Sequence, residues 1–151
     1  MAILVDGDAC PDLDLIKDVA IKKAQKMIVY VDYSHNILDD YFVTVFCETG
    51  KDNVDLALFN DIKEDDIVIT QDYGLASLAL TRKAKVLHVS GKIIDNDNID
   101  ELLLSRYLSS KERRSNVHLK GPKKRNSEVR KYFLEQLERV LEIGRSSCRE
   151  R

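Results

Sequence analysis

The sequence predicts an α/β fold with a mainly parallel sheet, and two observations lead to that fold class. Short apolar runs rich in Val, Ile and Tyr alternate along the chain with segments in which apolar residues recur at helical spacing. Acidic residues also follow several of the apolar runs, at the places where strands would end. The 151 residues, 44% hydrophobic and 33% charged, suit a single soluble globular domain with a core of its own.

Five apolar runs are the expected strands. They are Ala2–Asp6, Met27–Val31, Phe42–Phe46, Asp66–Thr70 and Lys85–Val89. Valine, isoleucine and tyrosine favour strands because their side chains pack well on a pleated surface. The alternation with helical segments predicts that most of these strands pair in parallel.

Five segments carry the apolar spacing of helices. They are Pro11–Gln25, Asn53–Ile62, Tyr73–Lys83, Asp100–Leu108 and Ser127–Ile143. Pro11 suits a first helical position, Ser127 can cap the last helix, and Gly144 is expected to end it. The single domain is therefore expected to cover residues 1–144, followed by a disordered tail over 145–151.

The charge of the chain is divided unevenly. Residues 1–105 hold 10 Lys and Arg against 20 Asp and Glu, whereas residues 106–151 hold 14 against 6. Residues 109–125 carry much of this positive charge together with Gly121 and Pro122, and we expect them to form an exposed basic loop. This division favours a polyanionic partner such as RNA; the alternative is that the basic end only neutralises the acidic body.

No feature of the sequence predicts export or a membrane. No apolar run reaches the roughly 18 residues that a transmembrane helix needs, and the first residues lack the pattern of a signal peptide. Cys10, Cys47 and Cys148 are an odd number without the spacing of a metal site, which favours a reduced, cytoplasmic protein. The sequence sets no oligomeric state.

Acidic residues from three separate segments are expected to meet at one edge of the sheet. They are Asp6 and Asp8 after the first strand, Asp52 and Asp55 at the start of the second helix, and Asp72 after the fourth strand. Carboxylates that share one cleft repel each other unless a cation lies between them. The sequence therefore predicts a Mg²⁺ or Mn²⁺ site, with Asp6 and Asp72 as principal ligands and the others as further ligands or as partners of metal-bound waters.

Helix capping is the structural alternative for most of these carboxylates. Asp8 and Asp72 precede expected helices, and Asp52 occupies a plausible N-cap position. Asp55 would lie in a first helical turn, where the helix dipole favours negative charge. Asp6 is different, because a carboxylate at the mouth of a buried strand needs a cation or hydrogen-bond donors.

A divalent cation at this edge points to phosphodiester hydrolysis. A bound cation lowers the pKa of its water, and a second cation about 4 Å away could stabilise the leaving oxygen. Asp6, Asp8 and Asp72 are the candidate catalytic residues. The candidate substrate-binding residues are Ser34, Asn36, Thr70 and Lys92 near the ends of strands and Arg113, Arg114, Lys123, Lys124 and Arg125 in the basic segment. Contacts of the basic side chains with phosphates would make binding fall with salt.

Several stretches of the sequence resemble a bacterial family of the UPF0178 type. Val5-Asp6-Gly7-Asp8-Ala9-Cys10-Pro11 is similar to the VDADACP opening of the YaiI/YqxD family. Residues 50–55 resemble the second acidic segment of that family, and residues 66–76 resemble a strand-Thr-x-Asp-x-x-Leu-Ala segment found there and in PIN domains. Gly121-Pro122 resembles its Gly-Gly-Pro element. The resemblance covers most of residues 2–142, and it departs from the pattern at Gly7, usually alanine, and at Lys120, where a second glycine is expected.

The resemblance implies a PIN-like, three-layer α/β/α sandwich with a divalent metal site. We call the sheet edge where Asp6, Asp8, Asp52, Asp55 and Asp72 are expected the acidic edge. Together with this edge and with the basic residues of 106–151, the resemblance predicts a metal-dependent endo- or exoribonuclease. Two alternatives stay open. Asp6-x-Asp8 also resembles the nucleophile and acid pair of haloacid-dehalogenase-type phosphatases, although Ala9-Cys10 replaces the expected Gly-Thr. The acidic cluster could also belong to a non-catalytic module that binds metal or RNA.

Overall fold

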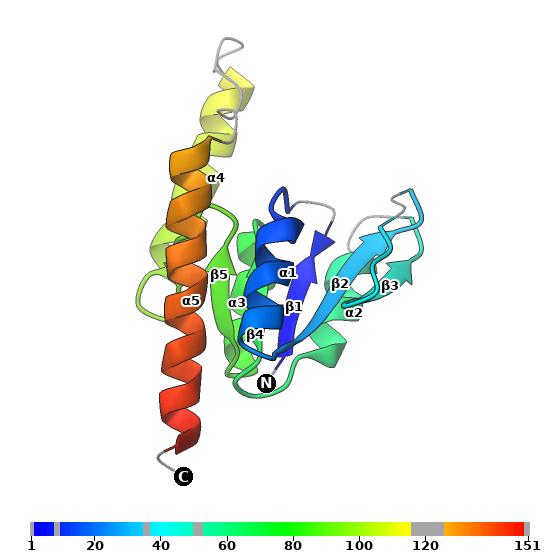
Figure 1. Ribbon diagram of the computed structural model, residues 1–151. Helices are drawn as coiled ribbons and strands as arrows, with labels where there is room; N and C mark the ends of the chain where they lie inside the picture. Colours follow the sequence, from blue (N-terminus) through cyan, green and yellow to red (C-terminus); the bar gives the residue numbers. More distant parts are fainter. Residues whose placement is uncertain (1, 8–9, 35–36, 50–52, 116–125, 150–151) are drawn as a thin grey trace.

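A central six-stranded sheet organises the protein (Figure 1). The computed structural model describes residues 2–7, 10–34, 37–49, 53–115 and 126–149, with side chains through 109 and from 126 to 142. The strands are β1 (Ala2–Asp6), β2 (Lys26–Asp32), β3 (Val43–Cys47), β4 (Ile67–Thr70), β5 (Lys85–His88) and β6 (Ile93–Ile94). Their order is β3-β2-β1-β4-β5-β6, and all neighbours pair in parallel except β5 and β6. The α/β class with a mainly parallel sheet is thereby confirmed.

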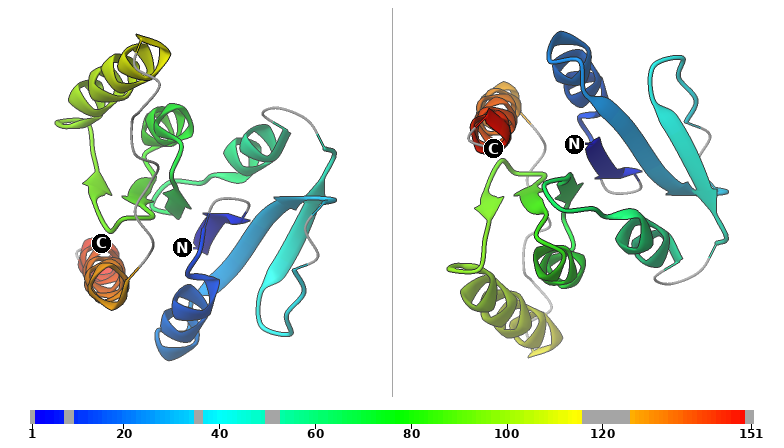
Figure 2. Two further views of the ribbon diagram at one scale, coloured as in Figure 1. Left: turned by 90° about the horizontal axis from the view of Figure 1, so that it is seen from above. Right: turned by 90° about the horizontal axis from the view of Figure 1, so that it is seen from below.

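Helices cover both faces of the sheet, which makes three layers (Figure 2). The helices α1 (Leu13–Lys22) and α5 (Ser127–Arg149) pack on one face, and α2 (Asn53–Asp61), α3 (Tyr73–Thr81) and α4 (Ile99–Ser115) pack on the other. The strands separate two hydrophobic clusters, because alternate residues of β1 and β2 point to opposite sides. Ile3 and Val29 belong to the cluster under α1, whereas Leu4 and Tyr30 belong to the cluster under α2 and α3.

Helices α1 and α3 are shorter than the sequence predicted. Ala24 and Lys83 adopt positive φ angles of 54° and 62° just after the helices end. A residue in this left-handed conformation closes a helix through hydrogen bonds to its last carbonyls. Accordingly, Gln25 N donates to Ala20 O at 2.8 Å.

Helices α4 and α5 both extend farther than the sequence predicted. Helix α4 continues to Ser115, so residues 109–115 of the expected basic loop are helical. Residues 116–125 lie outside the described part of the chain. Helix α5 passes through Gly144 to Arg149, so the expected stop at Gly144 and the disordered tail are wrong for residues 145–149. The physical reason is that an interior glycine weakens a helix by only about 1 kcal/mol.

Strand β6, which closes the sheet as a short antiparallel edge, was not among the strands expected from the sequence. It follows a turn in which Gly91 has a φ of +98°. A Cβ at this position would lie 2.5 Å from Tyr132 Cδ1 and 3.1 Å from Phe133 Cα. Phe133 and Leu137 of α5 are fully buried beside this turn and the sheet. Gly91 therefore lets α5 pack closely on the end of β5.

We expect Gly91→Ala to lower the free energy of unfolding by about 1–3 kcal/mol, because the methyl group meets α5 and the backbone conformation is strained. Urea denaturation measures the change. In a Tyr132→Ala background the cost of Gly91→Ala should be smaller, since part of the clash is removed. An unchanged urea midpoint for Gly91→Ala would contradict the close packing of α5 on this turn.

Candidate functional site

Hydrogen bonds connect Asp6, Thr70 and Asp72 at the carboxyl ends of the two central strands. Thr70 Oγ1 donates to Asp6 Oδ2 at 3.1 Å and accepts a hydrogen bond from Asp72 N at 3.0 Å. Strands β1 and β4 are adjacent, with Val5 opposite Ile69. This edge faces upward in Figure 1, and the left view of Figure 2 looks onto it. The strand ends that carry Asp6 and Asp72 are therefore adjacent, and a cation shared by the two carboxylates stays a prediction.

Asp6 is a buried carboxylate in this arrangement. Its exposed fraction is 6%, and Thr70 is fully buried beside it. Thr70 replaces part of the hydration that the carboxylate loses on folding, since a buried charge is costly without hydrogen-bond donors. Thr70 was proposed as a substrate-binding residue. Its hydroxyl holds the Asp6 carboxylate in place, and its contact with substrate stays a prediction.

Asp72 caps helix α3, which is the structural alternative considered above. Its Oδ1 accepts hydrogen bonds from Gly74 N at 2.8 Å and from Leu75 N at 3.3 Å. Both of these capping contacts use Oδ1, so neither engages Oδ2. Capping and metal binding are compatible for one carboxylate, because its two oxygens point in different directions.

A pocket between α2 and α3 brings the second acidic segment to the same region. The pocket has a volume of about 500 Å³, and Asp55 and Asp72 both line it. Its other lining residues are Leu56, Phe59, Gly74, Leu75, Ser77 and Leu78. Asp55 lies in the first turn of α2, where the helix dipole favours a negative charge. The site therefore joins acidic side chains to an apolar groove.

Asp32 is an acidic residue of this edge that the sequence analysis missed. It is the last residue of β2, the neighbour of β1, and it follows an apolar run just as Asp6 does. Leu4, Tyr30 and Val68 belong to the hydrophobic cluster under α2 and α3. Asp6, Asp32 and Thr70 each follow one of these residues by two positions, so the pleat places them on the face that α2 and α3 cover. The rule that selected Asp6 would have found Asp32.

Two of the proposed substrate-binding residues also lie at the carboxyl ends of strands. Ser34 follows β2, and its backbone N–H donates to Asp32 Oδ1 at 2.8 Å, as does its hydroxyl. Lys92 is exposed in the turn after β5, where its carbonyl accepts a hydrogen bond from His88 N. The topology thus gathers these residues along one edge, and their contact with substrate stays a prediction.

Several predicted site residues cannot be placed. Asp8, Asn36, Asp52, Lys123, Lys124 and Arg125 lie outside the described residues. Arg113 and Arg114 belong to helix α4, with no side chain described. In the described parts of the chain no group of three or more His, Cys, Asp or Glu side chains is arranged to hold a metal ion. The metal site therefore stays a prediction. The carboxylate and hydroxyl oxygens that are present are of the kind that Mg²⁺ prefers.

Gly7 allows the chain to leave β1 close to β2. A Cβ at Gly7 would lie 2.6 Å from the Cγ1 atoms of both Val29 and Val31. These valines are fully buried in strand β2, so they have little freedom to move. A side chain at position 7 would therefore collide with Val29 and Val31 of the next strand.

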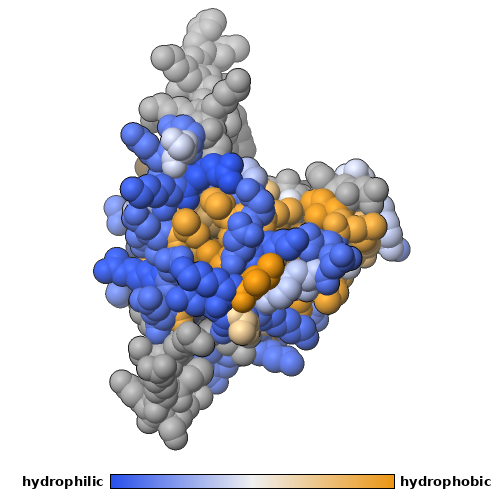
Figure 3. Space-filling view, in the orientation of Figure 1, coloured by the Kyte–Doolittle hydropathy of each residue, from blue (hydrophilic) through white to orange (hydrophobic). Residues whose placement is uncertain are grey.

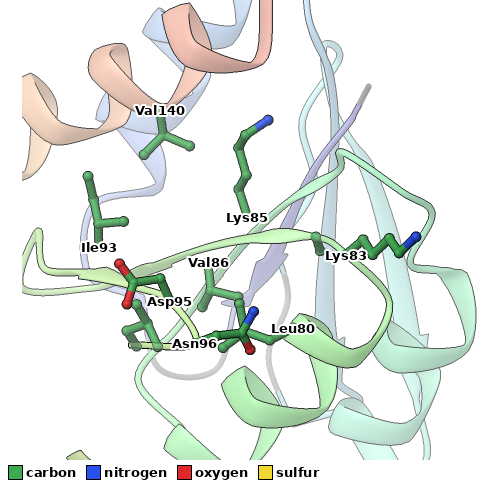
Figure 4. Close-up of a pocket in the computed structure, with 10 residues that line it drawn as sticks. Leu80, Lys83, Lys85, Val86, Ile93, Asp95, Asn96 and Val140 are labelled. Atoms are coloured by element: carbon green, nitrogen blue, oxygen red, sulfur yellow. The ribbon is translucent and has the colours of Figure 1, made fainter. Parts of the chain in front are cut away.

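A second pocket lies near the opposite edge of the sheet, and neither Asp6, Asp55 nor Asp72 lines it (Figure 4). It has a volume of about 380 Å³ and is lined by the start of β5, by Ile93–Asn96 and by Val140 of α5. Lys83 points away from Ile93 and Asp95 in Figure 4. Lys85 Nζ lies 3.7 Å from Asp65 Oδ1. The strands run away from this edge toward the candidate site.

The fold and the acidic edge define an α/β/α protein with a candidate site at the carboxyl ends of its parallel strands. The chain belongs to the family described as uncharacterized BCR, YaiI/YqxD family, which it matches over residues 4–143. The family assignment from the sequence motifs is therefore confirmed.

Curated relatives agree with this assignment over nearly their whole length. A UPF0178 protein of Clostridium novyi is 44% identical over 128 residues, which cover 85% of this chain and 86% of that protein. A UPF0178 protein of Lachnoclostridium phytofermentans is 41% identical over 144 residues, covering 93% and 97% of the two chains. These names state no activity, substrate or metal. No solved structure matches the chain.

None of the helices in the described part of the chain is both long enough and apolar enough to cross a bilayer.

We expect Thr70→Val to lower the free energy of unfolding by about 1–3 kcal/mol, because Asp6 loses a donor and Asp72 N loses its acceptor while the shape is kept. Thr44→Val is the matched control. Thr44 Oγ1 is buried and has no hydrogen-bond partner within the described residues, so its removal should be neutral or stabilising. Urea denaturation compares the two variants, and equal effects would show that the Thr70 hydrogen bonds contribute nothing particular to stability.

Proposed function

We propose that this protein hydrolyses phosphodiester bonds in RNA with the help of Mg²⁺ or Mn²⁺. The observation that carries the proposal is the meeting of Asp6 and Asp72 through Thr70 at the carboxyl ends of β1 and β4. Ligands of open α/β sheets bind at this edge, outside the ends of the strands. The resemblance to PIN domains in the Thr70-x-Asp72 segment supports the same reaction class.

The donor set fits a hard divalent cation. Asp6 and Asp72 would be its principal ligands, with Asp8, Asp52 and Asp55 as further ligands or as partners of coordinated waters. A bound cation would supply an activated water and stabilise charge on the phosphoryl oxygens. Thr70 would keep the Asp6 carboxylate oriented through its hydrogen bond.

The charge of the chain supports a polyanionic substrate. Lys92 is exposed at the same edge, after β5, and would meet a phosphate. The excess of Lys and Arg in residues 106–151 would neutralise further phosphates. A cytoplasmic location agrees with such a substrate and is part of the proposal.

We expect Asp6→Asn and Asp72→Asn each to reduce the cleavage of single-stranded RNA in Mn²⁺ by about 100-fold or more, a typical cost of removing one charge-stabilising group. Asparagine keeps the hydrogen-bond acceptor at position 6, and at position 72 it is also a good helix cap. These variants therefore remove the charge and preserve the fold.

The control for the cleavage experiment is Asp18→Asn, which changes an exposed carboxylate in the middle of α1. It should cleave as the wild type does. Equal cleavage by all four proteins would contradict the assigned roles. If the wild type instead hydrolyses p-nitrophenyl phosphate and leaves RNA intact, the phosphatase alternative replaces the nuclease.

Cation binding has a readout that is independent of cleavage. We expect Mn²⁺ at 100 times its dissociation constant to stabilise the wild type by about 2.7 kcal/mol. Asp6→Asn and Asp72→Asn should lose most of this stabilisation, and Asp18→Asn should keep it. Thermal unfolding with and without Mn²⁺ measures the effect, and a wild type whose Tm does not respond to Mn²⁺ or Mg²⁺ would remove the metal from the proposal.

A further inference from the structure

An exposed aromatic side chain lies beside the acidic edge. Tyr33 directly follows β2, and 67% of its surface is exposed. Its ring stacks on that of Phe46 in β3, with centroids 6.0 Å apart and an angle of 9° between the planes. Large aromatic side chains are normally buried in part, so an exposed ring held on a second ring is a candidate binding surface.

A turn in the backbone and the ring of Phe46 both restrain Tyr33. The next residue, Ser34, closes a turn by donating hydrogen bonds from its backbone N–H and its hydroxyl to Asp32. Phe46 is partly buried and packs against the hydrophobic cluster under α1. Tyr33 on Phe46, called the platform below, is therefore restrained before any ligand arrives. This reduces the conformational entropy that a ligand must offset on binding.

Strand register gives the distance from this platform to the acidic residues. Asp6 at the end of β1 lies opposite Tyr30 of β2, and Asp32, which ends β2, is two residues farther along; Tyr33 follows it directly. With the usual rise per residue and spacing between strands, the backbones of Asp6 and Asp32 are roughly 8 Å apart. Phe46 packs on the side of the sheet that α1 covers, whereas Asp6 lies on the side that α2 and α3 cover, so a nucleic acid strand that reaches both must pass over the carboxyl edge of the sheet.

We propose that Tyr33, supported by Phe46, is a stacking platform for an unpaired base of the nucleic acid whose backbone reaches the acidic edge. The inference rests on the proposed function and adds that the substrate is single-stranded there, because a paired base does not offer its face to a protein ring. Stacking on a ring tolerates any base, since every base has a π face.

Other exposed aromatic residues lack this combination of features. Tyr107 is 63% exposed on α4, and Tyr132 lies over the Gly91 turn. Among the described residues, neither takes part in a stacked pair of rings. Hydrophobic surface also gathers at the margin of the sheet over β2 and β3 (Figure 3). Leu38, in the segment between these strands, and Val43, the first residue of β3, are exposed.

The test measures binding without cleavage. A short fluorescent single-stranded RNA is titrated with the full chain in EDTA, and anisotropy reports the affinity. Tyr33→Leu still covers Phe46 but has no π face, and we expect it to weaken binding by about 5- to 100-fold. Tyr33→Phe and Tyr107→Leu should bind as the wild type does. Urea midpoints check that all variants are folded.

An abasic oligonucleotide of the same length separates stacking from phosphate contacts. The wild type should bind it more weakly than the RNA, and Tyr33→Leu should bind it as well as the wild type does. The inference is overturned if Tyr33→Leu binds the RNA like the wild type, if it loses the same factor on the abasic strand, or if the wild type does not bind the RNA.

The same experiments distinguish this inference from the nuclease proposal. Binding that depends on Tyr33, together with no cleavage in Mn²⁺, would retain the platform and reject the nuclease. Cleavage that needs Asp6, together with binding that ignores Tyr33, would retain the nuclease and reject the platform.

Discussion

The hydrogen bond between Thr70 and Asp6 is the interaction on which the candidate site depends. It links the two central strands of the sheet at their carboxyl ends, and the same hydroxyl fixes the backbone of Asp72 at the start of α3. One buried threonine thus sets the position of two carboxylates that are far apart in the sequence. The parallel pairing of β1 with β4 makes this possible, since it brings both strand ends to one edge.

Acidic residues serve the fold and the candidate site together in this protein. Asp72 caps α3 through one carboxylate oxygen, and Asp55 lies in the first turn of α2. Structural and chemical roles are therefore not exclusive alternatives for these side chains. A strand-to-helix turn needs a hydrogen-bond acceptor at the N-cap, and it places that acceptor at the edge where ligands of parallel sheets bind.

The surroundings of the acidic edge differ on the two sides. Toward β3, the ring of Tyr33 lies exposed on Phe46, and toward α2 and α3 an apolar groove runs from Asp55 and Asp72. Helix α5 is anchored on the opposite face, where Arg130 contacts Asp12 and Asp14 of the α1 region and Gly91 permits close packing. Helix α5, in the basic C-terminal third of the chain, is thereby tied to the body that carries the site.

The sequence by itself determined the fold class, the first five strands to within one residue at each end, the family, and the placing of Asp6 and Asp72 at the ends of strands. Periodicity and carboxylates at strand ends can be recognised within short segments of the sequence. Parallel pairing then brings the carboxyl ends of neighbouring strands to one edge of the sheet. Only the tertiary structure decided the two-residue strand β6, the extension of α4 and α5, and the stacking of Tyr33 on Phe46. Strand β6 and the Tyr33–Phe46 pair arise from contacts between different segments of the chain, and such contacts leave no periodic pattern in the sequence.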